Sequence, residues 1–164
     1  MPLLLTSLKT PIGTLNLLAD HHVLLGANFS TVLALRELLD PMDALKEIKI
    51  VKNIPVICDL ISGYFEGDFS SINAIQVRQP GATFSQSAWK AMRKVKPGKV
   101  ISYSDLAHHA GSPAAVRAAG SACAKNAIVL VVPCHRIVKS GGALGNYAYG
   151  LDTKQWLLRH EGAL

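Results

Sequence analysis

Residues 127–132 form an uninterrupted apolar run that ends at Pro133 and is followed by Cys134, His135 and Arg136. An apolar run of this length predicts a buried strand or core segment. A rigid segment can deliver a nucleophile to the edge of a core, and a neighbouring base or cation lowers the pKa of a thiol and so activates it. The same residues also fit an inert buried cysteine beside a surface histidine. Cys134 and His135 alone favour that second interpretation.

The composition limits the classes of protein to which the chain can belong. Its 164 residues suffice for one domain or two small ones, and 49% apolar content is enough for a core. No segment reaches the roughly 18 apolar residues that a transmembrane helix needs, and the first residues lack the features of a signal peptide. Three cysteines without regular spacing do not indicate a disulfide framework. We therefore expect reduced thiols, a cytoplasmic location and no membrane partner.

Charge is divided unevenly along the chain. Residues 1–79 hold 6 Lys and Arg against 8 Asp and Glu, a net charge of −2, whereas residues 80–164 hold 11 against 3, a net charge of +8. A basic module of this kind suggests a polyanionic partner. An ordinary solvated basic surface explains the charge about equally well.

The first half of the chain alternates short apolar stretches with turn residues, which predicts a β-meander followed by helices and further strands. The expected strands are residues 3–9, 12–19, 22–29, 47–52 and 72–77, and the expected helices are residues 31–39 and 55–65. This half shows no catalytic constellation. His21 and His22 are most simply loop residues, and Cys58 is most simply a core thiol.

The second half is helical in character and begins after an expected linker at residues 78–82. A helix is expected from Thr83, whose spacing to Gln86 is that of a capping box. A second helix is expected from Ser102 to Gly111, and a third from Ser112, with Ser112 as the cap and proline at the first helical position. Two short helices joined by a glycine turn are typical of helix-turn-helix motifs, whose second helix enters a groove of DNA.

The third expected helix combines small side chains with one long cation, Arg117. Small residues let a helix backbone approach a narrow surface closely. Alanines are also frequent in tightly packed interior helices, but Arg117 would then need a buried partner, because an unpaired buried charge is costly. A functional role for Arg117 is the simpler account.

The end of the chain adds a glycine-rich loop and a last helix. Residues 140–150 do not fit the phosphate-binding loop patterns, and Tyr147 could form one wall of a site for a planar ligand. Asp152 is expected to cap the last helix, which leads to His160 and Glu161. A carboxylate at that position could orient the imidazole of His135, although sequence alone does not bring the two together.

Taken together, these residues resemble the O6-alkylguanine-DNA alkyltransferases, also called methylated-DNA–protein-cysteine methyltransferases. The resemblance is strong over residues 84–162 and weaker in the first half. It is carried by Phe84-x-x-x-x-Trp89, Ser102-Tyr103, Ala115-Val116-Arg117-Ala118-Ala119-Gly120, Asn126, Pro133-Cys134-His135-Arg136, Gly145-Asn146-Tyr147 and Trp156-Leu157-Leu158-x-His160-Glu161-Gly162, and in the first half by Thr10-Pro11-Ile12-Gly13 and Tyr64-Phe65-Glu66-Gly67.

The resemblance implies an α+β fold with two domains. Residues 1–79 would form a ribonuclease-H-like antiparallel sheet with a helix, and residues 80–164 a mostly helical, winged helix-turn-helix-like alkyltransferase and DNA-binding domain. The implied substrate is double-stranded DNA containing O6-alkylguanine, with O4-alkylthymine as a further substrate. A monomer without a cofactor is expected, and cooperative binding on DNA is left open. No metal is expected either, since the first half lacks the cysteines of the family's zinc-binding variant, and adjacent His108 and His109 make a poor ligand pair.

The resemblance also implies roles for individual residues in a single irreversible transfer after base flipping. Cys134 would attack the alkyl carbon, while His135, Glu161 and a bridging water draw off the thiol proton. Tyr103 would help to rotate the base out and protonate the leaving guanine at N3, and Asn126 would brace the turn before Cys134. The DNA and the flipped base would be contacted by Arg117, which fills the space of the extruded nucleotide, and by Tyr103, Ala115, Ala118, Gly120, Ile137, Tyr147 and Ala148.

Three places depart from the family pattern. Residues 95–98, Val-Lys-Pro-Gly, replace the usual Ile-Pro-x-Gly. Ala127 follows Asn126 where the family usually has proline, so the turn is expected to be less rigid. Tyr149 stands where glycine is usual, which puts acceptance of large alkyl groups in question. Two other functions were weighed: a non-enzymatic protein that binds alkylated bases, whose known relatives lack the cysteine, and a Cys-His hydrolase, which would not need Arg117. A methyl-sensing regulatory domain is not expected within these residues.

Overall fold

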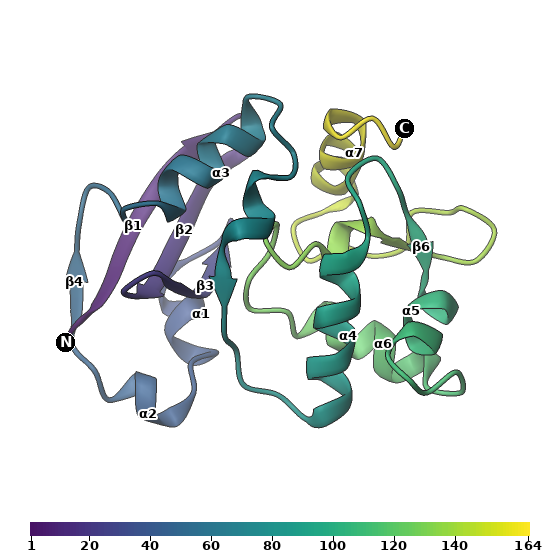
Figure 1. Cartoon of the computed structure of the whole chain (residues 1–164), viewed down its shortest axis with the longest axis horizontal. Coiled ribbons are helices and arrows are strands. Elements are labelled where there is room, and N and C mark those ends of the chain that lie inside the picture. The colour runs from purple at the N-terminus through teal and green to yellow at the C-terminus, as the bar shows by residue number, and fades with distance from the viewer. The chain divides into compact units, whose positions relative to one another are not determined.

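The computed structural model describes all 164 residues, and the chain forms two compact units (Figure 1). Unit 1 comprises Met1–Pro80 and Ala127–Val131, and unit 2 comprises Gly81–Asn126 and Val132–Leu164. The chain therefore leaves unit 2 after Asn126 and returns to it at Val132. The two domains expected from the sequence, which meet at residues 79 and 80, stay a prediction.

Unit 1 is built on a five-stranded sheet in the order β4-β1-β2-β3-β5. The β1–β2 and β2–β3 pairs are antiparallel, and the two outer strands pair in parallel, β4 with β1 and β5 with β3. The strands are β1 (Leu3–Thr10), β2 (Gly13–Asp20), β3 (Val23–Asn28), β4 (Ile48–Ile50) and β5 (Gln76–Val77). The predicted meander and the fourth strand are therefore confirmed, whereas the expected antiparallel sheet is corrected to a mixed one.

The central strand β2 is buried continuously from Leu15 to Ala19, which shows that both faces of the sheet are covered there. A strand buried on both faces loses the apolar–polar alternation of a half-exposed strand. Leu35 of helix α1 (Val32–Glu37) joins a core cluster with strand residues such as Leu3 and Leu18. Short helix α2 (Pro41–Ala44) follows, and helix α3 (Ile57–Phe65) buries Ile57, Cys58, Ile61 and Tyr64.

Two expectations in unit 1 are corrected by the structure. Residues 72–77 are not one strand, because the 3₁₀ turn η1 (Ser71–Ala74) takes up their first half and precedes β5. Helix α3 begins two residues after Pro55, since Val56 makes a tight turn with φ of 70° in which Ile57 donates to the Pro55 carbonyl. The expectation for the apolar run is confirmed in its second form, because Ala127–Val131 is a buried core segment with one bridge to β3.

Unit 2 combines helices with a small parallel sheet. Helices α4 (Thr83–Lys94), α5 (Tyr103–His109) and α6 (Val116–Ala124) pack on one another, and Trp89 of α4 donates through Nε1 to the Ala122 carbonyl of α6 at 2.9 Å. Two-residue strands β6 (Ile101–Ser102) and β7 (Ile137–Val138) pair in parallel. Helix α7 (Leu151–His160) ends the unit.

The predicted helix starts in unit 2 had different outcomes. The start of α5 is confirmed, with a complete capping box between Ser102 and Asp105. The cap predicted for α4 is wrong: Ala82 occupies the N-cap position, without a side-chain cap. Helix α6 starts at Val116 rather than at Pro113, because Ser112 takes part in a turn in which its carbonyl accepts from Ala115. Asp152 lies in the first turn of α7, and Gly150 is the N-cap residue.

No helix in the chain is both long enough and apolar enough to span a membrane.

Candidate active site

Cys134 is presented by two consecutive tight turns. Its backbone N–H donates to the Val132 carbonyl at 2.9 Å across Pro133, and it then begins the 3₁₀ turn η2 (Cys134–Arg136). Proline suits the first turn, since its φ is fixed near the observed −84°. The side chain of Cys134 is buried. The sulfur is thus held on a short, hydrogen-bonded segment in the interior of unit 2.

Asn126 braces the start of this segment. Its Nδ2 donates to the Val132 carbonyl at 2.8 Å, the same oxygen that accepts the Cys134 N–H. Its side chain also hydrogen-bonds to the Cys134 thiol. One amide therefore contacts both the turn and the sulfur.

The environment of Cys134 keeps its sulfur protonated in the free protein. Burial raises the pKa of the thiol, because the anion would lose its hydration, while the hydrogen bond from Asn126 and the positive charge of Lys154 act in the opposite direction. Burial prevails. A nucleophile of this kind needs a base that removes its proton as it reacts.

His135, Arg136 and Glu161 form a buried network next to Cys134. His135 Nε2 lies 2.8 Å from Glu161 Oε2, and Arg136 binds the same carboxylate through two nitrogens, each at 2.9 Å. Arg136 also donates to the Val95 carbonyl at 2.8 Å. The three side chains are at most 1% exposed, so each charge depends on its partners rather than on water.

The carboxylate of Glu161 fixes the tautomer and orientation of His135. Burial lowers the pKa of His135, and this outweighs the effect of Glu161 in the opposite direction, so the ring is neutral. Burial would raise the pKa of Glu161, but hydrogen bonds from His135 and Arg136 hold it well below its usual range. The neutral ring donates from Nε2 to the carboxylate, which leaves Nδ1 as a buried acceptor without a protein partner.

Lys154 supplies a second buried positive charge near Cys134. Its Nζ donates to the carbonyls of Ile137 at 2.6 Å and Asn146 at 3.2 Å, and its side chain is fully buried. Burial lowers the pKa of Lys154, whereas its electrostatic coupling to Cys134 raises it. Lys154 therefore ties strand β7 to the glycine-rich loop and adds a cation to the surroundings of the thiol.

Tyr103 and the glycine-rich loop come together at Gly145. A Cβ at position 145 would lie 3.1 Å from the Tyr103 hydroxyl, and φ of 75° also favours glycine there. The backbone of Asn146 hydrogen-bonds to the Tyr103 phenol, while burial raises its pKa to about 12. Tyr103 is thus a neutral phenol, electrostatically coupled to Cys134.

The aromatic residues of the same loop pack against each other. The rings of Tyr147 and Tyr149 meet edge to face with centroids 5.7 Å apart. Burial raises the pKa of Tyr149 to about 12, with a further contribution from Cys134. Three residues are expected from the resemblance to read the base through backbone groups. The Cys134 N–H is bound to the Val132 carbonyl, Ile137 is buried with its carbonyl bound by Lys154, and Ala148 is exposed.

Helix α6 presents Arg117 to solvent. Ala119 and Ala122 form its buried face, whereas Arg117 and Ala118 are exposed and Gly120 is partly buried. Arg117 is therefore not the buried cation that a tightly packed interior helix would require. Ala115 is the N-cap residue of α6, so the residues expected to face DNA lie at the beginning of this helix.

Comparisons with known proteins agree with this arrangement. Residues 83–163 match the family model described as 6-O-methylguanine DNA methyltransferase, DNA binding domain. A methylated-DNA–protein-cysteine methyltransferase of Methanosarcina acetivorans is 32% identical over 162 residues, covering 94% of this chain and 96% of the relative. The chain belongs to the methylated-DNA–protein-cysteine methyltransferase family.

Two further members of this family extend the comparison. The Salmonella typhimurium methyltransferase is 41% identical over 108 residues, but the match covers 66% of this chain and 63% of that relative. The solved structure of Mycobacterium tuberculosis OGT in complex with DNA has a TM-score of 0.81 at 27% identity and covers 98% of this chain and 93% of that one. The mixed α+β fold is therefore that of methyltransferases of known structure.

Two residues of the site were not singled out by sequence reasoning. Arg136 stands within the motif that links the chain to the methyltransferases, but its pairing with Glu161 depends on a contact 25 residues away. Lys154 occupies the first turns of a helix whose composition suggests an ordinary surface. Its spacing of three and four residues before Leu157 and Leu158, which are both buried, is the signal that places it on the buried face.

Proposed function

We propose that this chain transfers the alkyl group of O6-alkylguanine in double-stranded DNA to Cys134, in a single irreversible event. The observation that carries the proposal is the position of Cys134, in contact with Asn126 and followed directly by the buried His135–Glu161 pair. Family membership supports the same activity, as several relatives are named for it. O4-alkylthymine is proposed as a second substrate.

The chemistry follows from the protonation states around the thiol. The Cys134 proton passes through a bridging water to His135 Nδ1, and Glu161 stabilises the imidazolium that forms. The sulfur then attacks the alkyl carbon, so that a carbon–sulfur bond forms and the bond from that carbon to guanine O6 breaks. The departing guanine takes a proton at N3 from the hydroxyl of Tyr103, which regains one from solvent. The thioether is not reversed, so one chain repairs one lesion.

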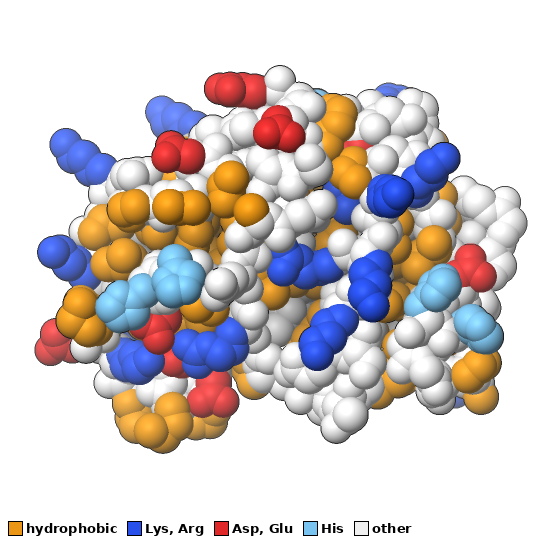
Figure 2. Space-filling model, viewed as in Figure 1, with side chains coloured by type: hydrophobic (Ala, Val, Ile, Leu, Met, Phe, Trp, Pro, Cys, Tyr) orange, Lys and Arg blue, Asp and Glu red, His pale blue; other side chains and the backbone are white.

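Base flipping is a physical requirement of this reaction, because a buried thiol does not reach O6 within an intact duplex. Exposed Arg117 at the beginning of α6 suits insertion into the base stack, with Ala115, Ala118 and Gly120 allowing close approach of the backbone. Basic side chains gather over α4 and the loop after it (Figure 2), where Lys90 and Lys94 line a groove of about 460 Å³. Such a surface attracts the phosphate backbone.

The same proposal extends to the fold of each unit, to the oligomeric state and to the cellular location of the chain. We infer a ribonuclease-H-like domain for unit 1, which its mixed five-stranded sheet with helices supports, and a winged helix-turn-helix for unit 2, which α5, α6 and the β6–β7 pair support. A monomer in the cytoplasm is expected. A protein that binds alkylated bases without repairing them is the alternative, and Cys134 with its buried base disfavours it.

The decisive experiment is the intact mass of the chain after mixing with excess duplex that carries one O6-methylguanine. A gain of one methyl group per chain, mapped to the peptide of Cys134 and absent in Cys134→Ala, is expected. Cys134→Ala should still bind the duplex. Tight binding of the wild-type chain without a gain in mass would favour the non-enzymatic alternative.

Arg117→Ala provides a separate test of the role of α6. We expect at least a tenfold slower transfer from duplex DNA, because the extruded base loses the side chain that fills its space, with transfer from free O6-benzylguanine changed much less. Both rates are measured by mass at pH 7, with Lys125→Ala at the exposed end of α6 as the control. Equal losses on the two substrates would count against insertion of Arg117.

A further inference from the structure

The segment before Cys134 is held by a side chain that is distant in sequence. Oε1 of Gln79 accepts a 2.9 Å hydrogen bond from the backbone N–H of Ala127, 48 residues further along the chain. Both residues are buried. A buried N–H has no water to bind in place of its acceptor, so this contact is costly to lose.

The position of this hydrogen bond matters because of the peptide to which it belongs. The N–H of Ala127 is part of the planar peptide that joins Ala127 to Asn126, so fixing the N–H restricts the backbone of Asn126 as well. Asn126 in turn donates to the Val132 carbonyl and hydrogen-bonds to the Cys134 thiol. Gln79 is thus connected to the sulfur through one peptide unit and one side chain.

The rest of the segment is held by backbone groups. Ala27 of β3 donates to the Ala127 carbonyl at 2.9 Å and accepts from the Val129 N–H at 3.2 Å. These bonds survive most side-chain substitutions, whereas the Gln79 contact does not. Alanine at position 127 leaves its φ angle free where a proline ring would fix it, so the hydrogen bond from Ala127 to Gln79 supplies the restraint.

We propose that Gln79 is a positioning residue for Cys134, which holds the Asn126–Ala127 peptide so that the Asn126 amide contacts both the Val132 carbonyl and the Cys134 sulfur. The inference rests on the proposed role of Cys134 as the nucleophile. Gln79, a residue of unit 1, thus influences the reactivity of a thiol in unit 2 along the chain, through the Asn126–Ala127 peptide.

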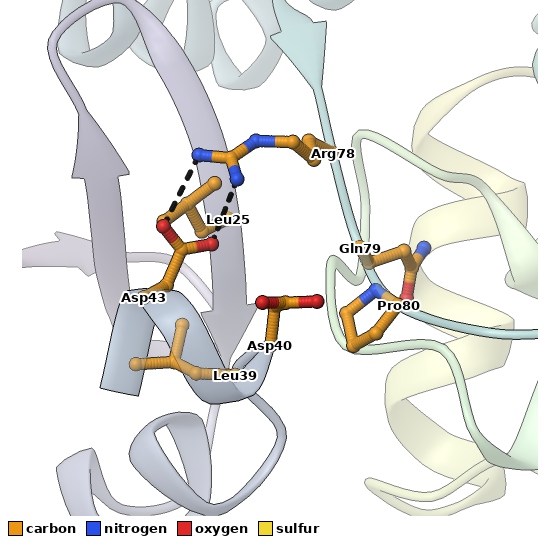
Figure 3. Close-up of a pocket in the computed structure, with 7 residues that line it drawn as sticks. All are labelled: Leu25, Leu39, Asp40, Asp43, Arg78, Gln79 and Pro80. Carbon is orange, nitrogen blue, oxygen red and sulfur yellow. Dashed lines mark hydrogen bonds and ion pairs between the residues drawn. The ribbon is translucent and has the colours of Figure 1, made fainter. Parts of the chain in front are cut away.

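The variant Gln79→Met tests this role with little change of shape. Methionine has a similar length and no acceptor for the Ala127 N–H, and Gln79 lies beside a cavity of about 80 Å³ that leaves room for adjustment (Figure 3). Gln76→Met on exposed strand β5 is the matched control, because it makes the same chemical change at the surface.

The readout is the rate at which iodoacetamide labels Cys134 between pH 6 and 10, measured on the tryptic peptide of residues 126–136, which contains no other cysteine. Loss of the Asn126 contact raises the pKa of the thiol, so Gln79→Met should label about fivefold more slowly at pH 7 and its profile should move to higher pH. The other titratable groups around the sulfur are unchanged in both variants: Tyr103, Cys123, His135, Tyr149 and Lys154.

A second substitution distinguishes positioning from a general loss of stability. Ala127→Pro in the Gln79→Met background removes the unsatisfied N–H and fixes φ, and it should bring the labelling rate back to within about twofold of the wild type. A Gln79→Met chain that melts at a lower temperature but labels with the wild-type pH profile would overturn the proposal, and so would a double variant as slow as Gln79→Met.

Iodoacetamide needs neither DNA nor an alkylated base. A wild-type chain that gains no methyl group from O6-methylguanine would therefore overturn the proposed function and leave this labelling comparison valid.

Discussion

Charged side chains are arranged in opposite ways in the two units. In unit 1, Lys46 and Arg78 bind the carboxylates of Asp20 and Asp43 at 2.8 to 3.4 Å, and Figure 3 shows the Arg78–Asp43 pair. The two cations are 37% and 48% exposed. The network around Glu161 in unit 2 has bonds of similar length, but its side chains are at most 1% exposed. The bond lengths therefore do not distinguish the contributions of these two networks to stability, whereas burial does.

The difference follows from how much of its hydration each charged group loses on folding. Lys46 and Arg78 retain much of their hydration, and salt screens their attraction to the carboxylates. Arg136 and Glu161 have given up water entirely, so each has only its partners, and removing one leaves the other buried without compensation. Lys154 is a third case, because its partners in the interior are two carbonyl oxygens rather than a carboxylate.

Glu161→Gln should have the largest effect on stability. It leaves Arg136 as a buried cation without its counter-charge, which costs about 3 to 5 kcal/mol. The measurement is the free energy of unfolding in urea at pH 7, with Asp20→Asn in unit 1 as the control. An equal loss in the two variants would show that burial does not separate the networks.

The same variant should change the pH dependence of stability. The pKa of Glu161 in the folded chain lies below its ordinary value, so its contribution is complete above the ordinary carboxyl pKa and is lost as pH falls toward the folded-state pKa. The lowered pKa of buried His135 acts in the same direction, since the unfolded chain binds a proton more readily. Because the substitution removes the Glu161 contribution, unfolding of Glu161→Gln should depend less on pH below the ordinary carboxyl pKa of 4.5 than that of the wild type.

Lys154→Met should have an intermediate effect, seen mainly in reactivity. Removing this cation raises the pKa of the Cys134 thiol, and we expect the pH profile of Cys134 labelling to move to higher pH. Lys154→Arg, which retains the charge, is the control for the lost packing. A profile that does not move in Lys154→Met would limit Lys154 to holding β7 and the loop together.

Lys46→Met should have the smallest effect, although Lys46 contacts two carboxylates and Lys154 contacts none. An exposed ion pair contributes little, and salt screens it. We expect the unfolding midpoint in 0.5 M NaCl to equal that of the wild type within error. If Lys46→Met lowered the unfolding midpoint in 0.5 M NaCl as much as Lys154→Met does, the contrast between the two lysines would disappear.

Local signals in the sequence explain which parts of the fold were predictable. The three strands of the meander and the capping box of α5 depend on residues close together in the chain, and both are confirmed. Ser112 and Pro113 carry an equally good local signal for a helix start, yet tertiary packing places them in a turn and begins α6 at Val116. Residues 72–75 likewise have strand-like composition but form part of a 3₁₀ turn.

The site was predictable in its residue types but not in all its contacts. Sequence reasoning suggested that Glu161 orients His135, and the structure brings the two within 2.8 Å. The contacts of Arg136, Lys154 and Gln79 depend on partners 17 to 48 residues away. Nothing in their immediate neighbours specifies such partners. The catalytic roles assigned to the site stay predictions.

The excursion of Ala127–Val131 into unit 1 has a consequence for the solubility of fragments. A piece consisting of residues 81–164 retains this segment but lacks Ala27 and Gln79, which bind its backbone. The six adjacent apolar residues 127–132, four of them β-branched and none charged or proline, are then free to pair with the same segment of another copy. The fragment of residues 81–164, which contains Cys134, should therefore aggregate when it is produced without residues 1–80.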